Sequence, residues 1–157
     1  LDDLFELIKP INYLEKIYEC SEIISVFKKY KFRLSLKLLF LPQLLEFIGY
    51  TKPINIYVTD INQTIRLSWL KKLSFSEMKL NPEISLNSNS LIFTVSNDYG
   101  IDSLGVNGRF REEKNNGLSN VEKFFVYQTL SQNGYTLLKP IPFLKRITKS
   151  FYTKFLK

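Results

Sequence analysis

The hydrophobic pattern changes its period at Pro53, and this change constrains the fold more than any other feature of the sequence. Over the first fifty residues, apolar side chains recur every three or four positions, which is the spacing of one helix face. The residues with this spacing are Ile11, Leu14, Ile17, Tyr18, Ile24, Phe27, Leu34, Leu38, Leu41, Leu45 and Ile48. After Pro53, apolar and polar residues alternate, as in half-buried strands. The pattern therefore predicts an α+β protein with a helical N-terminal segment at residues 1–50.

Five short segments carry the strand pattern, namely 54–58, 65–69, 73–75, 84–86 and 103–110. In the last of these, "SLGVNGRF", Leu104, Val106 and Phe110 are expected to point to one side of the strand. Short turns such as "DINQ" separate the early segments, which favours neighbouring strands that meander. We therefore expect a twisted, mostly antiparallel sheet of about five strands, covered by helices, in a domain over residues 51–134.

A helix is expected before Gly134, which would stop it. Ser119 precedes Glu122 by three residues, the spacing of a capping box at a helix start. Val121, Phe124, Phe125 and Leu130 supply its apolar stripe.

Residues 135–157 form a basic tail with six lysines and arginines and no acid. Leu144, Ile147, Phe151 and Phe155 fall on one face of a helix, and such a basic amphipathic helix can lie in an anionic membrane surface. The same pattern suits a terminal helix that docks on its own domain, so both interpretations stay open. The residues expected to face a membrane are Lys145, Arg146, Lys149, Phe151 and Phe155.

The composition excludes several kinds of chemistry. There is no histidine and one cysteine, Cys20, so triads with histidine, zinc-hydrolase sites and internal disulfides are ruled out. The sparse cysteine suits a reducing cytoplasm. No apolar run approaches the roughly 18 residues of a membrane span, so we expect a cytoplasmic protein, at most peripheral to a membrane. Because the chain starts at Leu1 with no basic leader, we expect it to be a fragment of a longer protein.

The net charge of +7 admits nucleic acid as an alternative partner. Two basic clusters carry it, at residues 28–37 and 139–157, with tyrosine and phenylalanine interspersed. No nucleic-acid-binding motif accompanies them, and the abundance of Lys, Asn and Ile suggests AT-rich codons as a source of lysine. Nucleic acid is therefore the second hypothesis.

The stretch "NDYGIDSLGVNGRF" at residues 97–110 invites a third hypothesis. It lacks the pattern of a phosphate loop, since no Lys-Ser/Thr follows and G-x-G-x-x-G is absent. Asp98 and Asp102, with Asp60 elsewhere, are the candidate carboxylates of an enzyme, but each has the local sequence of a turn. We therefore expect no enzyme activity, no catalytic or metal-binding residues and no cofactor.

Part of the chain resembles the sterol carrier protein type-2 domain. The similarity lies in "INIYVTDINQTIRLSWL", in the segment from "NPEISL" to "VNGRF", and in "VEKFF". It resembles especially the versions attached behind metallo-β-lactamase-fold hydrolases, which often carry a "G-x-D-x-L-x-V-N-G-x-F" run; here it begins at Gly100 and ends at Phe110. The match covers roughly residues 53–131.

The resemblance implies a helix at residues 89–98, where "SLIFTV" has the propensity of a strand. It also implies an apolar cavity between sheet and helices that admits an acyl chain or a sterol. The residues that would line it are Leu67, Trp69, Phe75, Leu86, Leu91, Val95, Leu104, Phe124 and Phe125; ordinary core packing explains the same residues without a ligand. The first hypothesis is thus a non-catalytic module that binds or presents an apolar ligand, perhaps within a larger hydrolase-like protein.

Overall fold

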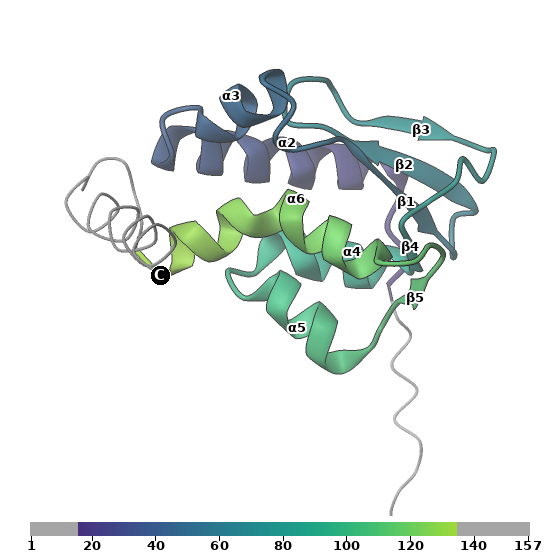
Figure 1. The fold of residues 1–157 in the computed structure, drawn as a ribbon. Coiled ribbons are helices and arrows are strands. Elements are labelled where there is room, and N and C mark those ends of the chain that lie inside the picture. Colours follow the sequence, from purple (N-terminus) through teal and green to yellow (C-terminus); the bar gives the residue numbers. More distant parts are fainter. Residues whose placement is uncertain (1–15, 135–157) are drawn as a thin grey trace, which may run out of the picture.

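The structure is a computed structural model that describes residues 16–134 (Figure 1). Predictions for residues 1–15 and for the tail at 135–157, including Lys145, Arg146, Lys149, Phe151 and Phe155, lie outside this range. In chain order the elements are α2 (Cys20–Lys37), α3 (Leu41–Phe47), β1 (Ile54–Val58), β2 (Gln63–Leu67), β3 (Ser74–Ser76), β4 (Ile84–Leu86), α4 (Ser88–Ser96), α5 (Gly100–Asn107), β5 (Arg111–Glu112) and α6 (Gly117–Gln132).

The five strands form one sheet in the order β3-β2-β1-β4-β5. The pairs β1–β2, β2–β3 and β4–β5 are antiparallel, whereas β1 and β4 at the centre are parallel. The expected α+β fold with about five mostly antiparallel strands is therefore confirmed. In β1, Ile54, Ile56 and Val58 are buried and alternate with half-buried Asn55 and Tyr57, as the period of two predicts.

The connection from β3 to β4 crosses the face of the sheet that the helices leave open. It must pass β2 and β1 to reach β4 in the strand order. On this face the Asn55 amide donates a hydrogen bond of 3.0 Å to the Leu80 carbonyl, and the Lys79 ammonium lies 5.1 Å from the centre of the Tyr57 ring. Residues 77–82 thus partly cover the polar face of β1.

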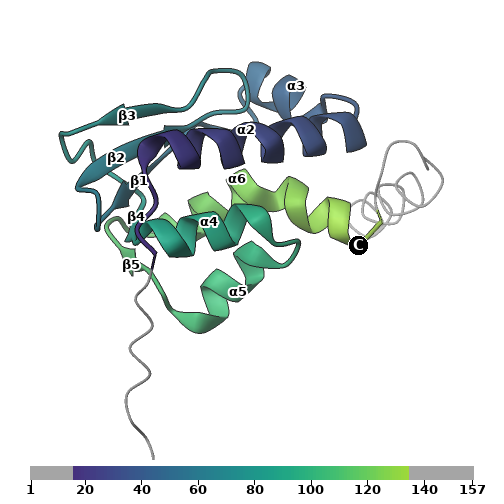
Figure 2. The ribbon, with the colours of Figure 1, turned by 180° about the vertical axis from the view of Figure 1, so that it is seen from behind.

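The helices pack on the other face of the sheet, as the two views of the ribbon show (Figures 1 and 2). α6 contacts β1, β4, α2 and α5. α2 contributes Ile23, Phe27, Tyr30 and Leu34 to the same hydrophobic core as the sheet and α6. The predicted boundary between residues 50 and 51 therefore falls at a change of secondary structure within one core.

Around α4 and α5, one local prediction was wrong and one was confirmed. Residues 103–107 of the predicted strand 103–110 belong to helix α5, and the strand that pairs with the sheet is Arg111–Glu112, just after the predicted segment. A Cβ on Gly100 would lie 2.1 Å from the Thr94 carbonyl oxygen, so glycine allows α5 to begin against α4. The helix expected at 89–98 is present as α4, although its residues favour a strand locally.

The predicted capping box at Ser119 was also wrong. α6 begins two residues earlier, at Gly117, after Asn116 in the left-handed region with φ 61°. A Cβ on Gly117 would lie 2.1 Å from the Glu83 carbonyl oxygen, so close packing on β4 sets the start of the helix. The end was predicted correctly, because α6 stops at Gln132 and Gly134 has φ +71°.

Candidate apolar-ligand site

The residues predicted to line a cavity lie in the core between the sheet and the helices. Phe75 on edge strand β3 is partly buried, and the other eight are buried, namely Leu67, Trp69, Leu86, Leu91, Val95, Leu104, Phe124 and Phe125. They come from β2, β4, α4, α5, α6 and the residues after β2. The structure thus brings most of the predicted set into one core.

Aromatic rings fill the middle of this core. The Trp69 ring stacks on Phe124 with 5.4 Å between ring centres and meets the edge of Tyr127 at 5.2 Å. The indole N–H donates to the Phe124 carbonyl at 3.3 Å. Trp69, predicted as a ligand contact, therefore has its stacking partners and its hydrogen-bond acceptor within the protein.

One polar atom in this ring cluster has no hydrogen-bond partner among the described residues. It is the hydroxyl of Tyr30, whose ring lies against Phe27, Trp69 and Phe125. Burial raises the pKa of Tyr30 well above its ordinary value, so the hydroxyl stays neutral.

A surface groove lies beside the core, between α6 and the segment at residues 50–54. Its volume is about 600 Å³, within the range of small-molecule sites. Its apolar residues are Pro53, Ile54, Phe124 and Val126; Ile54 and Phe124 are buried beneath it, and Phe124 belongs to the predicted ligand-binding set. The polar residues of the groove are Tyr50, Thr51, Lys52, Glu83, Asn120 and Lys123.

Glu83 is held at the groove by two donors. Its carboxylate accepts hydrogen bonds from the Lys114 ammonium at 2.7 Å and from the Asn120 amide at 2.8 Å. Burial alone would raise the pKa of Glu83, but these two hydrogen bonds and the Lys114 charge lower it below its ordinary value. The carboxylate is therefore ionised at neutral pH, and together with Lys123 it makes the lining of the groove partly charged.

The groove adjoins a group of exposed apolar side chains. Tyr50 lines the groove and is 79% exposed, and Phe47 and Ile48 at the end of α3 are 77% and 63% exposed.

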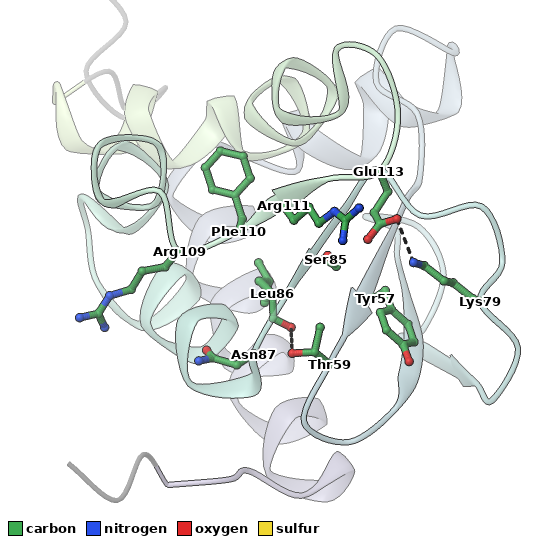
Figure 3. A pocket seen from close by; sticks show the side chains of 10 residues that line it. All are labelled: Tyr57, Thr59, Lys79, Ser85, Leu86, Asn87, Arg109, Phe110, Arg111 and Glu113. Carbon is green, nitrogen blue, oxygen red and sulfur yellow. Dashed lines mark hydrogen bonds and ion pairs between the residues drawn. The ribbon is translucent and has the colours of Figure 1, made fainter. Parts of the chain in front are cut away.

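A second pocket, of about 620 Å³, lies over the helix-free face of the sheet (Figure 3). The Lys79 ammonium pairs with the Glu113 carboxylate at 2.8 Å, and hydrogen bonds from Lys79 and Ser85 lower the pKa of Glu113. Figure 3 shows Arg111 beside Ser85 and Glu113, whereas Arg109 points away. This pocket is charged and polar, so the groove beside α6 suits an apolar ligand better.

The three candidate carboxylates occupy separate positions. Asp60 accepts hydrogen bonds from the Ser88 backbone N–H at 2.9 Å and from its hydroxyl, which fixes the start of α4. Asp98 pairs with Arg33 at 3.6 Å, and Asp102 lies in the first turn of α5. Within residues 16–134, no three His, Cys, Asp or Glu side chains are grouped to hold a metal ion.

The basic cluster at residues 28–37 is partly engaged inside the protein. Lys31 donates to the backbone carbonyls of Ser68 at 2.7 Å and Lys71 at 2.9 Å, and burial lowers its pKa. Arg33 pairs with Asp98. Lys28 and Lys29 remain exposed, so this cluster offers a nucleic acid fewer free charges than the sequence suggests.

The chain was compared with models of protein families, with curated proteins and with solved structures, and none of them matched. No helix in the described part of the chain is long and apolar enough to cross a membrane.

The sequence prediction missed the groove apart from Phe124. Its lining comes from the segment after α3, the start of β1, Glu83 before β4, and α6, and a hydrophobic pattern does not show which of these residues meet. The break at Pro53, where two kinds of element join, is the sequence signal closest to it.

Proposed function

We propose that the chain is a non-catalytic module that binds or presents an apolar ligand, such as an acyl chain or a sterol. The observation that carries the proposal is the groove of about 600 Å³ beside α6, which is lined by exposed Tyr50 and Val126; Phe47 and Ile48, close to Tyr50 in sequence, are exposed as well. Charged Glu83 and Lys123 in the same lining suit a ligand that carries a polar group as well as an apolar chain. The resemblance to the sterol carrier domain implies a ligand of the same class. We propose the groove as the site at which the ligand binds.

The first test is a search for bound ligand. The purified protein is extracted with organic solvent, and the extract is examined by mass spectrometry beside an unrelated protein prepared in the same way. We expect an acyl or isoprenoid species in a molar ratio near one. An empty extract from folded protein that also fails to bind a fluorescent fatty acid would refute the proposal.

A pair of valine substitutions then tests the location. Val126 lines the groove and is 38% exposed, whereas Val106 on α5 is 86% exposed and is not part of the groove. We expect Val126→Lys to weaken fatty-acid binding by about tenfold, because it places a charge among apolar contacts. Val106→Lys should bind as the unmodified protein does, and equal affinities for the two variants would place the ligand elsewhere.

A further inference from the structure

The turn between α2 and α3 exposes four large apolar side chains. They are Leu36, Leu39, Phe40 and Leu44, which are 48%, 54%, 59% and 56% exposed. We call these four residues the hairpin tip. It lies at the end of the molecule away from the sheet, where α6 also ends (Figure 1).

The backbone at the hairpin tip is strained. Leu39 and Phe40 have φ values of 47° and 60°, in the left-handed region that side chains with a Cβ rarely adopt. This conformation is unfavourable for a residue with a Cβ, because the Cβ crowds the following carbonyl oxygen. Hydrogen bonds hold it, since Phe40 N–H donates to the Ser35 carbonyl at 2.8 Å and the Gln43 amide donates to the Ser35 hydroxyl. Strain of this kind that presents apolar groups to solvent points to a function for those groups.

The segment from Lys28 to Pro53, which carries the hairpin tip, is net basic, and Asp98 from outside this segment pairs with Arg33. Glu46 is the one acid between Lys28 and Pro53, and it is buried against Ser68 and Trp69. Lys28, Lys29 and Lys52 in the same segment are exposed.

This charge discriminates among the molecules that could cover the hairpin tip. A second copy of the chain would bring the same lysines against themselves. The segment at residues 135–157 carries six basic residues and no acid, so it is repelled in the same way. An anionic bilayer offers both an apolar interior for the tip and negative head groups for the lysines.

We propose that the hairpin tip inserts into the surface of an anionic bilayer, with Leu39 and Phe40 at the acyl boundary and the nearby lysines at the head groups. This inference goes beyond the proposed function and does not depend on the groove holding a ligand.

The test uses the full chain and a variant with Leu39→Asn and Phe40→Asn. Asparagine tolerates the left-handed backbone better than leucine or phenylalanine, so the variant should fold at least as stably. Flotation is measured with vesicles of phosphatidylcholine and phosphatidylglycerol, and with phosphatidylcholine alone. We expect the unmodified protein to prefer the anionic vesicles and the variant to bind them at least about tenfold more weakly, because two apolar anchors are lost.

Met78→Asn is the matched control, since Met78 is 72% exposed and lies in the connection between β3 and β4. It should bind vesicles as the unmodified protein does. A second reading comes from Phe40→Trp, whose added emission should shift to shorter wavelength with anionic vesicles.

Several results would overturn the proposal. One is equal vesicle binding by the unmodified protein and the double asparagine variant, which would assign the membrane contact to another segment. Another is no binding to anionic vesicles by the unmodified protein. A third is a concentration-dependent dimer that the asparagine substitutions dissociate, which would assign the tip to a second copy.

Discussion

Two core tyrosines, Tyr30 and Tyr127, differ in one hydrogen bond. The Tyr127 hydroxyl shares a hydrogen bond with the Thr51 hydroxyl, whereas the Tyr30 hydroxyl is buried without a partner among the described residues. Tyr30→Phe removes an unsatisfied group and should leave the free energy of unfolding unchanged or raise it by about 1 kcal/mol. Tyr127→Phe leaves the Thr51 hydroxyl without this partner and should lower the free energy of unfolding by about 1–2 kcal/mol. Urea unfolding of both variants checks this, and a clear loss in Tyr30→Phe would reveal a partner for that hydroxyl.

Three glycines give an ordered set of expected effects. A Cβ on Gly100 or Gly117 would lie 2.1 Å from a backbone carbonyl oxygen, whereas on Gly105 its nearest neighbour is 3.9 Å away. Gly100→Ala and Gly117→Ala should each lower the free energy of unfolding by about 2–3 kcal/mol, because the backbone must shift to make room for the Cβ. Gly105 lies in the same helix as Gly100, and Gly105→Ala should raise the free energy of unfolding by about 0.5–1 kcal/mol, because alanine has the higher helix propensity. Thermal unfolding ranks the three, and an equal loss at Gly105 would contradict the packing of α5.

Glu83 should make stability depend on pH in the acid range. Its pKa is lower in the folded protein than its ordinary value of 4.5, so its contribution is complete above that value. The contribution is lost as the pH falls through the folded pKa, when the carboxylate that binds Lys114 and Asn120 is protonated. Glu83→Gln should therefore lower the free energy of unfolding by about 2 kcal/mol at pH 7. Below pH 4.5, the stability of this variant should change less with pH than that of the unmodified protein. Exposed Glu77→Gln is the control, and its profile should match that of the unmodified protein.

At the scale of elements, a buried polar network joins the two N-terminal helices to the connection after β2. From α3, Glu46 accepts hydrogen bonds from the Ser68 hydroxyl and the Trp69 N–H. From α2, Lys31 donates to the carbonyls of Ser68 and Lys71. The network supplies partners for the backbone of a connection that has no ladder of its own.

Glu46→Ala should destabilise the connection after β2 more than helix α3, to which Glu46 belongs. Removing the carboxylate leaves two donors unsatisfied, which should cost about 3 kcal/mol. Hydrogen exchange at residues 68–71 should accelerate more than exchange in β1. Glu46→Gln keeps one acceptor, so its exchange rates at residues 68–71 should lie between those of the unmodified protein and Glu46→Ala. Unchanged exchange at Trp69 in Glu46→Ala would contradict the network.

The elements also show what the sequence could predict. Strand β1 was predicted because one face is buried and the other is not, so its period of two is visible in "INIYV". Helix α5 was missed because its buried residues Ile101 and Leu104 are three apart, while Leu104 and Val106 also fit alternation. The contact of Gly100 with α4, which decides between these, is not local in sequence.

At the scale of the whole molecule, α2 belongs to the single core. Its buried residues pack with Trp69 and Phe125 through Tyr30. A chain of residues 51–134 alone should therefore lack fixed tertiary packing, whereas residues 16–134 should fold. Near-ultraviolet circular dichroism and the dispersion of amide resonances check this, and a folded 51–134 chain would make the N-terminal helices an appendage.

The candidate site was less predictable than the core. The nine predicted ligand residues are apolar, and a hydrophobic pattern identifies such residues as inward-facing. Whether they surround a cavity depends on how rings such as Trp69, Phe124 and Tyr127 fit together in space. The exposure of Phe40 depends on a left-handed backbone in the turn, which its sequence does not favour.

The parallel pairing of β1 with β4 also implies an order of folding. β1 finds β2 across a turn of four residues, so this hairpin closes a short loop and can form early. Ile56 pairs with Ile84, and β2, β3 and the crossing connection lie between the two in the chain. Pairing of β1 with β4 closes a longer loop than the β1–β2 hairpin, so we expect it to form later, at the rate-limiting step. Substitutions in β4 should then slow folding, while those in β3 at the sheet edge should mainly speed unfolding.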